Sequence, residues 1–275
     1  MATTRKGKEV KAFFAPNYER NEDGEVIFPR DTKLHNLILP ALDPTEHVAK
    51  CNMHMIQALV EYVSEVGESI LDPFTGRGTI LIAVSMGRKV ICIEIEQPFV
   101  VMLENNLKMM RNTIPDIDEM VTLIPGDTYK ILPIPNLANH AIFSPPWGNV
   151  LRKKSVDEIA KEWGYESATK YSAHPDNIAN LNDFIYFQKM EKVYRKIYDS
   201  LTPGGTMTII IKDRMEAGVR VKLGMRAKRD CERVGWEPVA WNRWRAIGGA
   251  FAAVNRAKGQ ETVEEEDLIT LRKPV

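Results

Sequence analysis

The sequence predicts an α/β fold, a mostly parallel, twisted sheet with helices on both faces. The main observation is that apolar runs of strand length alternate with amphipathic segments of helical length along most of the chain. This alternation is typical of parallel sheets, because each parallel connection needs a crossover that a helix usually supplies. The second observation is the length of 275 residues, which suffices for one large α/β domain or for a domain with an appended lobe.

The first half of the chain supplies helices and strands in turn. Apolar residues recur at helical spacing within 45–66, and the apolar run at 69–74 predicts a buried strand. The segment 79–87 predicts a helix that ends at a glycine. A second strand is expected at 89–95 and a second helix at 98–112.

The second half continues the pattern, with a polar interruption at 148–182. The elements expected there are, in order, strands that end within 121–127 and 140–146, an amphipathic helix at 181–201, a strand at 206–213, a helix at 219–235, and final strands at 236–244 and 266–273. The long helix is closed by Thr-Pro-Gly-Gly, which cannot continue it.

The polar segments suggest how the chain is divided. Residues 1–45 are polar and interrupted by prolines, so they are expected to form an arm packed on the domain. Residues 46–275 are expected to form that domain. Within it, residues 148–182 are polar, weakly periodic and longer than a simple connection needs. They are a candidate insertion for recognising a substrate.

Composition excludes several classes of protein. The formal net charge of zero argues against a binder that holds nucleic acid by charge alone. No apolar run is long enough to span a bilayer, and the N-terminus lacks a signal-peptide apolar region. The three cysteines, Cys51, Cys92 and Cys231, are far apart and form no CxxC pair, so neither disulfides nor a metal site is expected. A reduced, cytoplasmic protein is the expectation.

A glycine-containing loop, Asp-Pro-Phe-Thr-Gly-Arg-Gly-Thr at 72–79, follows the first predicted strand. In open parallel sheets, ligands bind beyond the carboxyl ends of the strands. Gly76 and Gly78 carry no side chains, so the backbone there can approach a ligand and donate N–H groups to it. The spacing is GxG rather than GxGxxG, which suits a nucleoside better than a pyrophosphate.

Two acids stand at the ends of the next two strands. Glu94 falls 22 residues after Asp72, where a carboxylate can accept both ribose hydroxyls of an adenosine group. Asp127 ends the third strand and could accept a hydrogen bond from an adenine amino group. Each acid alone could equally be a helix cap or a solvated turn residue. Their positions at successive strand ends favour a nucleoside-containing cofactor.

The tetrapeptide Ser144-Pro145-Pro146-Trp147 follows another predicted strand. The two prolines fix φ and lack N–H groups, so the carbonyl oxygens of Ser144 and Pro145 are held as acceptors. An aromatic amine is a weak nucleophile because its lone pair is delocalised into the ring. Hydrogen bonds from that amine to the Ser144 hydroxyl and the Pro145 carbonyl would localise the lone pair and aim it at a methyl sulfonium, while Trp147 could stack on the ring. The alternative is a rigid loop with a packed Trp.

These motifs resemble those of the DNA amino-methyltransferases, which modify N4 of cytosine or N6 of adenine. The loop at 72–79 resembles their cofactor loop, Glu94 their ribose-binding acid, and the tetrapeptide at 144–147 their catalytic motif; the resemblance covers roughly 45–275. It implies a Rossmann-like class I methyltransferase fold and S-adenosyl-L-methionine as cofactor. The implied cofactor-binding residues are Asp72, Pro73, Phe74, Gly76, Gly78, Thr79, Glu94 and Asp127. The implied catalytic residues are Ser144, Pro145, Pro146 and Trp147.

The resemblance also implies a substrate. Ser in the first position of the tetrapeptide resembles the cytosine-N4 enzymes, whereas Asp or Asn is commoner in the adenine-N6 enzymes. A site-specific DNA-methyltransferase acting on N4 of cytosine is therefore implied, with N6 of adenine as the alternative. Duplex DNA hides the amine, so base flipping is implied. An RNA-base or protein-glutamine methyltransferase, and a non-catalytic nucleic-acid-binding module on the same fold, stay open.

Basic residues near these motifs are candidates for contacts with DNA phosphates. They are Arg152, Lys153 and Lys154, directly after the tetrapeptide, and Arg243 and Arg245, which interleave with Trp241 and Trp244. The surrounding segment 212–245 holds ten Lys or Arg against five Asp or Glu. A solvated turn and an ordinary packed strand are the respective alternatives. No separate target-recognition domain is evident, so specificity is expected either to come from residues 148–182, the N-terminal arm and the basic C-terminal segment, or to be modest.

Overall fold

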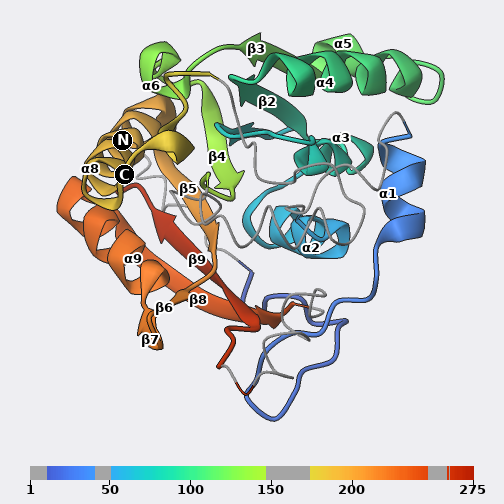
Figure 1. Ribbon diagram of the computed structural model, residues 1–275. Coiled ribbons are helices and arrows are strands. Elements are labelled where there is room, and N and C mark those ends of the chain that lie inside the picture. Colours follow the sequence, from blue (N-terminus) through green and yellow to red (C-terminus); the bar gives the residue numbers. More distant parts are fainter. Residues whose placement is uncertain (1–10, 41–50, 147–173, 247–258, 260) are drawn as a thin grey trace, which may run out of the picture.

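The protein is built on one seven-stranded sheet of order β3-β2-β1-β4-β5-β9-β8 (Figure 1). The computed structural model describes residues 11–40, 51–146, 174–246, 259 and 261–275. The strands of the sheet are β1 (Ser69–Asp72), β2 (Lys89–Glu94), β3 (Val121–Pro125), β4 (Ala138–Phe143), β5 (Leu201–Ile211), β8 (Glu237–Arg245) and β9 (Glu265–Arg272). The first five run parallel, and β9 lies antiparallel between β5 and β8.

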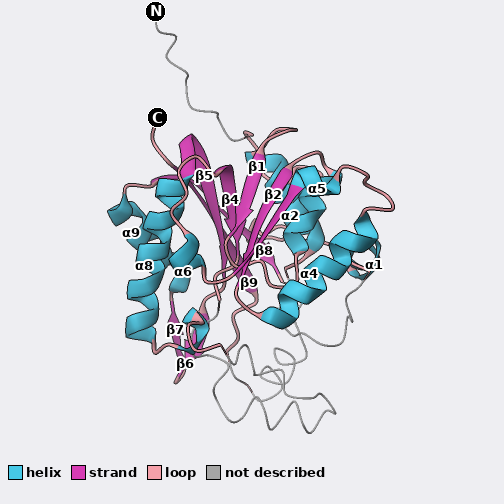
Figure 2. Ribbon diagram, turned by 90° about the horizontal axis from the view of Figure 1, so that it is seen from above, coloured by secondary structure: helices cyan, strands magenta, loops and turns pink. Residues whose placement is uncertain are grey.

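Helices cover both faces of the sheet (Figure 2). One face carries α2 (Met53–Val63), the 3-10 turn η1 (Thr79–Leu81), α3 (Ile82–Ser85), α4 (Gln97–Met110) and α5 (Ile117–Met120). The other face carries α6 (Thr128–Ile131), η3 (Ile178–Asn180), α8 (Asp183–Ser200) and α9 (Leu223–Val234). The predicted α/β fold class, with a mostly parallel sheet between two helical layers, is confirmed.

The strand order reverses between β1 and β4. From β1 the chain proceeds outward through β2 to β3, and it then returns to β4 and proceeds outward through β5 on the other side. Connections to parallel strands are right-handed, so helices of the two halves fall on opposite faces. The loops after β1 and β4 therefore part in opposite directions and leave a crevice at the carboxyl ends of the strands, where ligands bind in such sheets.

One predicted helix begins later than expected. Residues 219–221 form strand β7, which pairs antiparallel with β6 (Arg214–Glu216), and α9 begins only at Leu223. Ala217 and Gly218 both have positive φ, which suits the two-residue turn of a hairpin. The prediction of one helix over 219–235 was wrong at its start, because Val219 and Val221 satisfy strand alternation as well as helical spacing.

The N-terminal segment contributes to the core. Phe14 and Phe28 are buried, and Phe28 packs against the ring of Trp244 at a centroid distance of 5.8 Å. Val26 donates its N–H to the carbonyl of Arg243 and accepts from the N–H of Arg245, each at 2.9 Å. The described part of the arm thus lies along β8 and supplies core residues. It also carries α1 (Thr32–Ile38). Within the described ranges, no helix combines the length and apolar character that crossing a bilayer requires.

Candidate active site

A cavity of about 590 Å³ opens at the carboxyl ends of the strands. Its volume lies within the range of about 300–1,000 Å³ that small-molecule and cofactor sites have. Ten of the residues predicted from the sequence line it: Asp72, Pro73, Phe74, Gly76, Thr79, Glu94, Asp127, Ser144, Pro145 and Pro146. The fold therefore brings the glycine loop, both acids and the start of the tetrapeptide to one site. Trp147 lies outside the described residues.

The glycine loop is held in place by its own hydrogen bonds. Asp72 Oδ1 accepts the N–H of Phe74 at 3.0 Å. The Thr75 hydroxyl lies 3.0 Å from the carbonyl oxygen of Asp72 and 3.2 Å from that of Ile93, to either of which it can donate. Gly76 has a φ of +52°, a conformation that favours glycine. The loop after β1 is thereby tied to the end of β2.

Glu94 completes the link between the two strand ends. One carboxylate oxygen accepts the N–H of Gly76 at 2.6 Å, and the other accepts the N–H of Glu96 at 2.8 Å. Burial raises the pKa of Glu94, and these two N–H groups oppose the rise because they stabilise the charged form. Each oxygen keeps a further lone pair for a ligand hydroxyl in the cavity. The carboxylate is thus fixed in position before any ligand binds.

Asp72 is the most perturbed carboxyl of the cavity. Burial raises its pKa to about 7; the N–H of Phe74 opposes this rise, and the nearby charge of Glu94 adds to it. A carboxyl in this state carries a proton for much of the time at neutral pH. Perturbed groups of this kind in a cleft are typical of functional sites, although structural burial produces them too.

Asp72→Asn should stabilise the protein in a pH-dependent way. The folded-state pKa lies above the ordinary value of an aspartate, about 4, so this carboxyl opposes folding increasingly as the pH rises from about 4 to about 7. At pH 8 the free energy of unfolding of the variant should therefore exceed that of the wild type by roughly 2–4 kcal/mol, and at pH 4 the two should differ little. Urea unfolding at both pH values measures this. The exposed Asp23→Asn is the control; equal gains for both variants would contradict the assignment.

Asp127 has a structural contact as well as a place on the cavity wall. Its Oδ1 accepts the N–H of Tyr129 at 2.9 Å and caps α6. The hydroxyl of the next residue, Thr128, donates a hydrogen bond to the carbonyl oxygen of Pro73 and so connects this cap to the glycine loop. The helix-cap alternative is therefore realised, and the second carboxylate oxygen is the one available for a ligand.

Gly78 has a different place from the one predicted. It has a φ of +84° and precedes η1, but it does not belong to the cavity lining. A Cβ at this position would approach Leu103 Cδ2 to 2.4 Å. Gly78 therefore allows the first turn after the loop to pack on α4.

Gly78→Ala should destabilise the fold by about 2–4 kcal/mol, because it adds backbone strain to overpacking against buried Leu103. Gly24 provides a matched control. It has a similar φ of +77°, and a Cβ there would meet nothing within 4 Å. Gly24→Ala should cost about 1–2 kcal/mol, the backbone term alone. Urea unfolding of both variants tests the difference; equal losses would contradict the packing role.

The tetrapeptide begins where β4 ends. Phe143 pairs with Ile209 of β5 and packs against the ring of Phe74 at a centroid distance of 5.8 Å. Ser144 is partly exposed to the cavity, and Pro145 is buried. The end of β4 thus places Ser144 and Pro145 on the wall of the cavity that the glycine loop also lines. An amine could be held there with its nitrogen facing a ligand of that loop.

Several cavity residues were not predicted. Asn177 donates to Glu96 Oε1 at 2.8 Å and joins the segment before α8 to the end of β2. Further members are Arg30, Asp31, Thr32 and Asn52 from the first part of the chain, and Lys212, Trp244 and Glu266 from the last. Trp244 belongs to the run of interleaved Trp and Arg residues, and no local motif marks the others. Only the proximity of distant segments in the fold brings them together.

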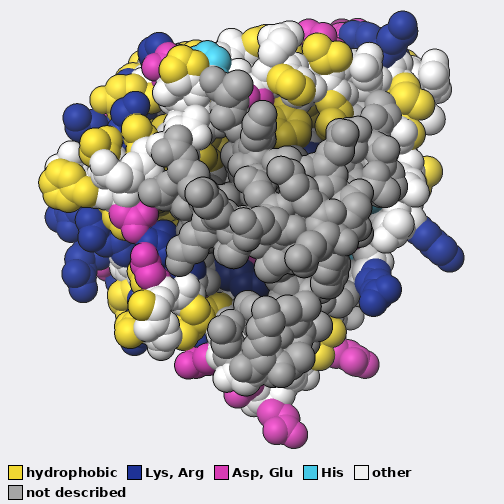
Figure 3. Space-filling view, in the orientation of Figure 1, with side chains coloured by type: hydrophobic (Ala, Val, Ile, Leu, Met, Phe, Trp, Pro, Cys, Tyr) yellow, Lys and Arg dark blue, Asp and Glu magenta, His cyan; other side chains and the backbone are white. Residues whose placement is uncertain are grey.

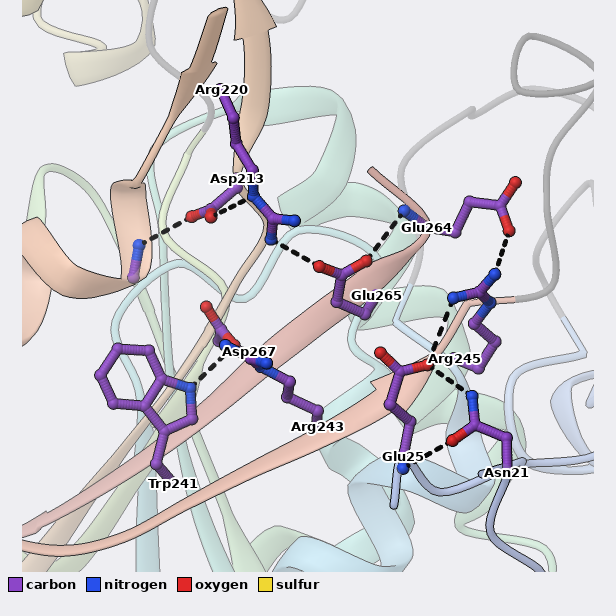
Figure 4. A network of polar contacts seen from close by, with 11 residues as sticks. Asn21, Glu25, Asp213, Arg220, Trp241, Arg243, Arg245, Glu264, Glu265 and Asp267 are labelled. Carbon is purple, nitrogen blue, oxygen red and sulfur yellow. Dashed lines mark hydrogen bonds and ion pairs between the residues drawn. The ribbon is translucent and has the colours of Figure 1, made fainter. Parts of the chain in front are cut away.

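The predicted DNA-contacting residues have mixed outcomes. Arg152, Lys153 and Lys154 lie outside the described residues. Arg243 donates to Asp267 at 2.8 Å, and Arg245 is paired with Glu25 and Glu264 at 3.3 and 2.6 Å (Figure 4). Both guanidinium groups thus have carboxylate partners, and the indole N–H groups of Trp241 and Trp244 donate to Asp267 and Glu266. These contacts count against free phosphate binding by Arg243 and Arg245, which stays an untested prediction.

The wider basic segment is also largely neutralised. Figure 3 shows Lys and Arg side chains gathered on the side of the molecule that α8 and α9 form. Seven of the ten basic residues in 212–245 form ion pairs: Arg214, Arg220, Arg226, Lys228, Arg233, Arg243 and Arg245. Most of the positive charge is therefore locally balanced. Lys212, Lys222 and Arg229 form no such pair with the described residues.

Comparisons with known proteins agree with this architecture. Residues 3–105 match the family model N6_N4_Mtase, described as DNA methylase. A search of curated proteins finds no match to the chain. The structure of the [4+2]-cyclase SpnF is 16% identical, with 91% of this chain and 99% of that chain covered and a TM-score of 0.54. The glycopeptide N-methyltransferase MtfA with bound S-adenosyl-L-homocysteine is 12% identical, with 90% and 99% covered and a TM-score of 0.51.

At these identities the solved structures show the fold alone. One of them is a cyclase by its title, so the fold does not determine the reaction. The family match supplies the more specific likeness. The resemblance to the DNA amino-methyltransferases is thus confirmed over residues 3–105, which include the glycine loop and Glu94 but not the tetrapeptide.

Proposed function

We propose that the protein transfers a methyl group from S-adenosyl-L-methionine to the exocyclic N4 amine of cytosine in DNA. The observation that carries this proposal is the shared cavity, in which Ser144 and Pro145 lie beside the glycine loop and Glu94. Nucleophile-holding and cofactor-holding groups must lie within one site for direct transfer. The DNA methylase match and the methyltransferase fold support the same chemistry.

The residues of the cavity fit an adenosine-containing cofactor. Glu94 is fixed by two N–H groups and would accept the ribose hydroxyls, while Asp127 keeps one carboxylate oxygen for an amino group. Gly76 adds no side chain where the loop borders the cavity. The cofactor, when bound, supplies an electrophilic methyl group on a sulfonium.

The substrate amine is held by the tetrapeptide. The Ser144 hydroxyl and the Pro145 carbonyl would each accept a hydrogen bond from one N–H group of the amine. These hydrogen bonds would withdraw the nitrogen lone pair from conjugation with the ring and direct it at the methyl group. Trp147 would stack on the base, a contact worth about 1–3 kcal/mol in other nucleic-acid sites. Because a paired base is out of reach, cytosine would be flipped out of the duplex.

The remaining predicted segments extend this proposal. Residues 148–182 follow the tetrapeptide and would contribute the sequence recognition that the catalytic domain, 46–275, needs. The arm, 1–45, would contribute through its contacts along β8. Arg152, Lys153 and Lys154 would hold phosphates that flank the flipped base.

Methyl transfer to unmethylated DNA of mixed sequence tests the function. The purified protein is incubated with methyl-labelled S-adenosyl-L-methionine, and the DNA is digested to nucleosides for mass analysis. N4-methylcytosine is the expected product. N6-methyladenine alone would overturn the choice of base and keep the chemistry. Transfer only to RNA or to a protein amide, or no transfer despite cofactor binding, would overturn the proposal.

A further inference from the structure

The cavity extends beyond the cofactor residues toward β9 and β8. Lys212, Trp244 and Glu266 line this extension. Ile211 ends β5 and pairs with Asp267 of β9, so Lys212, the residue after β5, comes next to Glu266 if the same register continues. Trp244 pairs with Glu266 across β8 and β9. The three residues thus form one row across neighbouring strands.

This row shares a face of the sheet with the tetrapeptide. Ser144 and Lys212 come one residue after β4 and β5 end and two residues after Ile142 and Ile210, so continued alternation would place them on the face of those isoleucines. Ile142 and Ile210 belong to one core cluster and both line the cavity. Lys212 lies about 7 Å further along the strand direction than Ser144, from the register of β4 and β5 and a rise of about 3.3 Å per residue. A pyrimidine with hydrogen bonds at both ends bridges such a spacing.

Lys212 is distinctive among the basic residues of its segment. Lys212, Lys222 and Arg229 are the three without an ion pair to the described residues, and of these Lys212 alone lines the cavity. It lies near enough to Glu266 to lower the pKa of that carboxyl, yet the two form no salt bridge within 4.0 Å. Both residues line the same cavity.

Glu266 provides the second polar wall. Trp244 donates its indole N–H to Oε2 at 2.9 Å, and among the described residues the carboxyl makes no other hydrogen bond. Burial raises the pKa of Glu266, while Lys212 and the indole oppose the rise. A proton on this carboxyl therefore costs less than on an exposed glutamate, and the protonated form can donate a hydrogen bond through Oε1.

We propose that Glu266 and Lys212 read the ring edge of the flipped cytosine, with Glu266 donating to N3 and Lys212 donating to O2. This inference rests on the proposed function, because Ser144 and Pro145 must hold N4 at the same time. Cytosine presents a donor, an acceptor and a second acceptor along this edge. The cavity presents the complement: the acceptors of the tetrapeptide, then a carboxyl donor, then an ammonium donor.

The same groups disfavour adenine. Adenine presents its amine and N1, but a C–H group replaces the carbonyl oxygen at the third position. The Lys212 ammonium would then be desolvated without an acceptor, and sites built around such a hydrogen bond reject analogues that lack it by up to about 10⁴–10⁵-fold. Lys212 would thus determine the choice between the two bases that the tetrapeptide alone leaves open.

Lys212→Met tests the inference, with exposed Lys222→Met as the matched control. Once the methylated sequence is known, kcat/KM is measured on duplexes that carry cytosine at the target position. A second duplex carries a C-nucleoside of 2-aminopyridine, which keeps the amine and ring nitrogen but lacks the carbonyl oxygen. The affinity for S-adenosyl-L-homocysteine is measured for every variant and should stay within twofold.

The wild type should lose at least about 100-fold in kcat/KM from cytosine to the analogue, and Lys212→Met should lose a similar factor on cytosine. On the analogue, Lys212→Met should equal the wild type, because the interaction is already absent. Lys222→Met should behave as the wild type on both. Glu266→Gln should keep activity through its amide donor, and Glu266→Leu should lose it.

Two failures are distinguishable. If the wild type methylates cytosine but Lys212→Met loses the same factor on both duplexes, or matches Lys222→Met, base reading by Lys212 is overturned and the proposed function stands. Loss of activity in Glu266→Gln equal to that in Glu266→Leu would overturn the role of the carboxyl as donor. If the wild type forms no N4-methylcytosine, the proposed function fails and this inference with it.

Discussion

Ser144→Ala should slow methyl transfer by about 10²–10³-fold while leaving cofactor affinity within twofold. Removal of one positioned hydrogen-bonding group from an active site has costs of this size. The hydroxyl lies at the end of β4 on the cavity wall, and its loss would leave the amine with a single acceptor, the Pro145 carbonyl. Single-turnover transfer of labelled methyl, at saturating DNA and cofactor, isolates this step.

Ser85→Ala is the control for this experiment. Ser85 is exposed, ends α3 and donates to the carbonyl of Ile82 at 2.7 Å, away from the cavity lining. It should transfer methyl groups at the wild-type rate. A rate for Ser144→Ala within threefold of the wild type would remove the hydroxyl from the mechanism. A parallel loss of cofactor affinity would instead indicate damage to the loop.

Glu94→Ala should weaken binding of S-adenosyl-L-homocysteine by at least about 100-fold. The change removes the ribose acceptor and leaves two N–H groups, of Gly76 and Glu96, without the carboxylate that fixes them. Hydrogen bonds to a charged group contribute about 1.5–3 kcal/mol each, and an unpaired buried donor adds its own cost. Titration calorimetry measures the affinity directly.

Glu104→Ala is the matched control, because Glu104 is an exposed acid on α4. It should bind the ligand as the wild type does. Glu94→Gln should fall between the two, since an amide offers one acceptor oxygen where the carboxylate offers two. If Glu94→Ala binds as tightly as Glu104→Ala, the cofactor does not contact the end of β2.

The parts of the site that follow a strand could be predicted from the sequence. The glycine loop, Glu94 and the tetrapeptide each come directly after an apolar run, and parallel strands deliver their carboxyl ends to one edge. Local pattern and topology therefore agree for these residues. Gly78 shows the limit of this reasoning, because its neighbour Leu103 lies on a helix that local sequence does not place beside it.

The remaining wall of the cavity depends on contacts that no local pattern reveals. Lys212 and Glu266 come near each other because β5 and β9 pair antiparallel. Arg243 and Arg245 looked available for DNA because the sequence shows their charge but not their partners. Those partners, Asp267, Glu25 and Glu264, come from β9, the arm and the residue before β9 (Figure 4). Charge counts along the chain therefore overestimate the free positive surface.

The place of β9 has a consequence for biosynthesis. It is translated after every other strand of the sheet, yet it lies between β5 and β8. Until it leaves the ribosome, β5 has an open edge and β8 has no partner from the sheet. The nascent protein can thus complete the half of the cavity that contains the glycine loop before the half that contains Glu266, and the cavity is complete only when β9 is inserted.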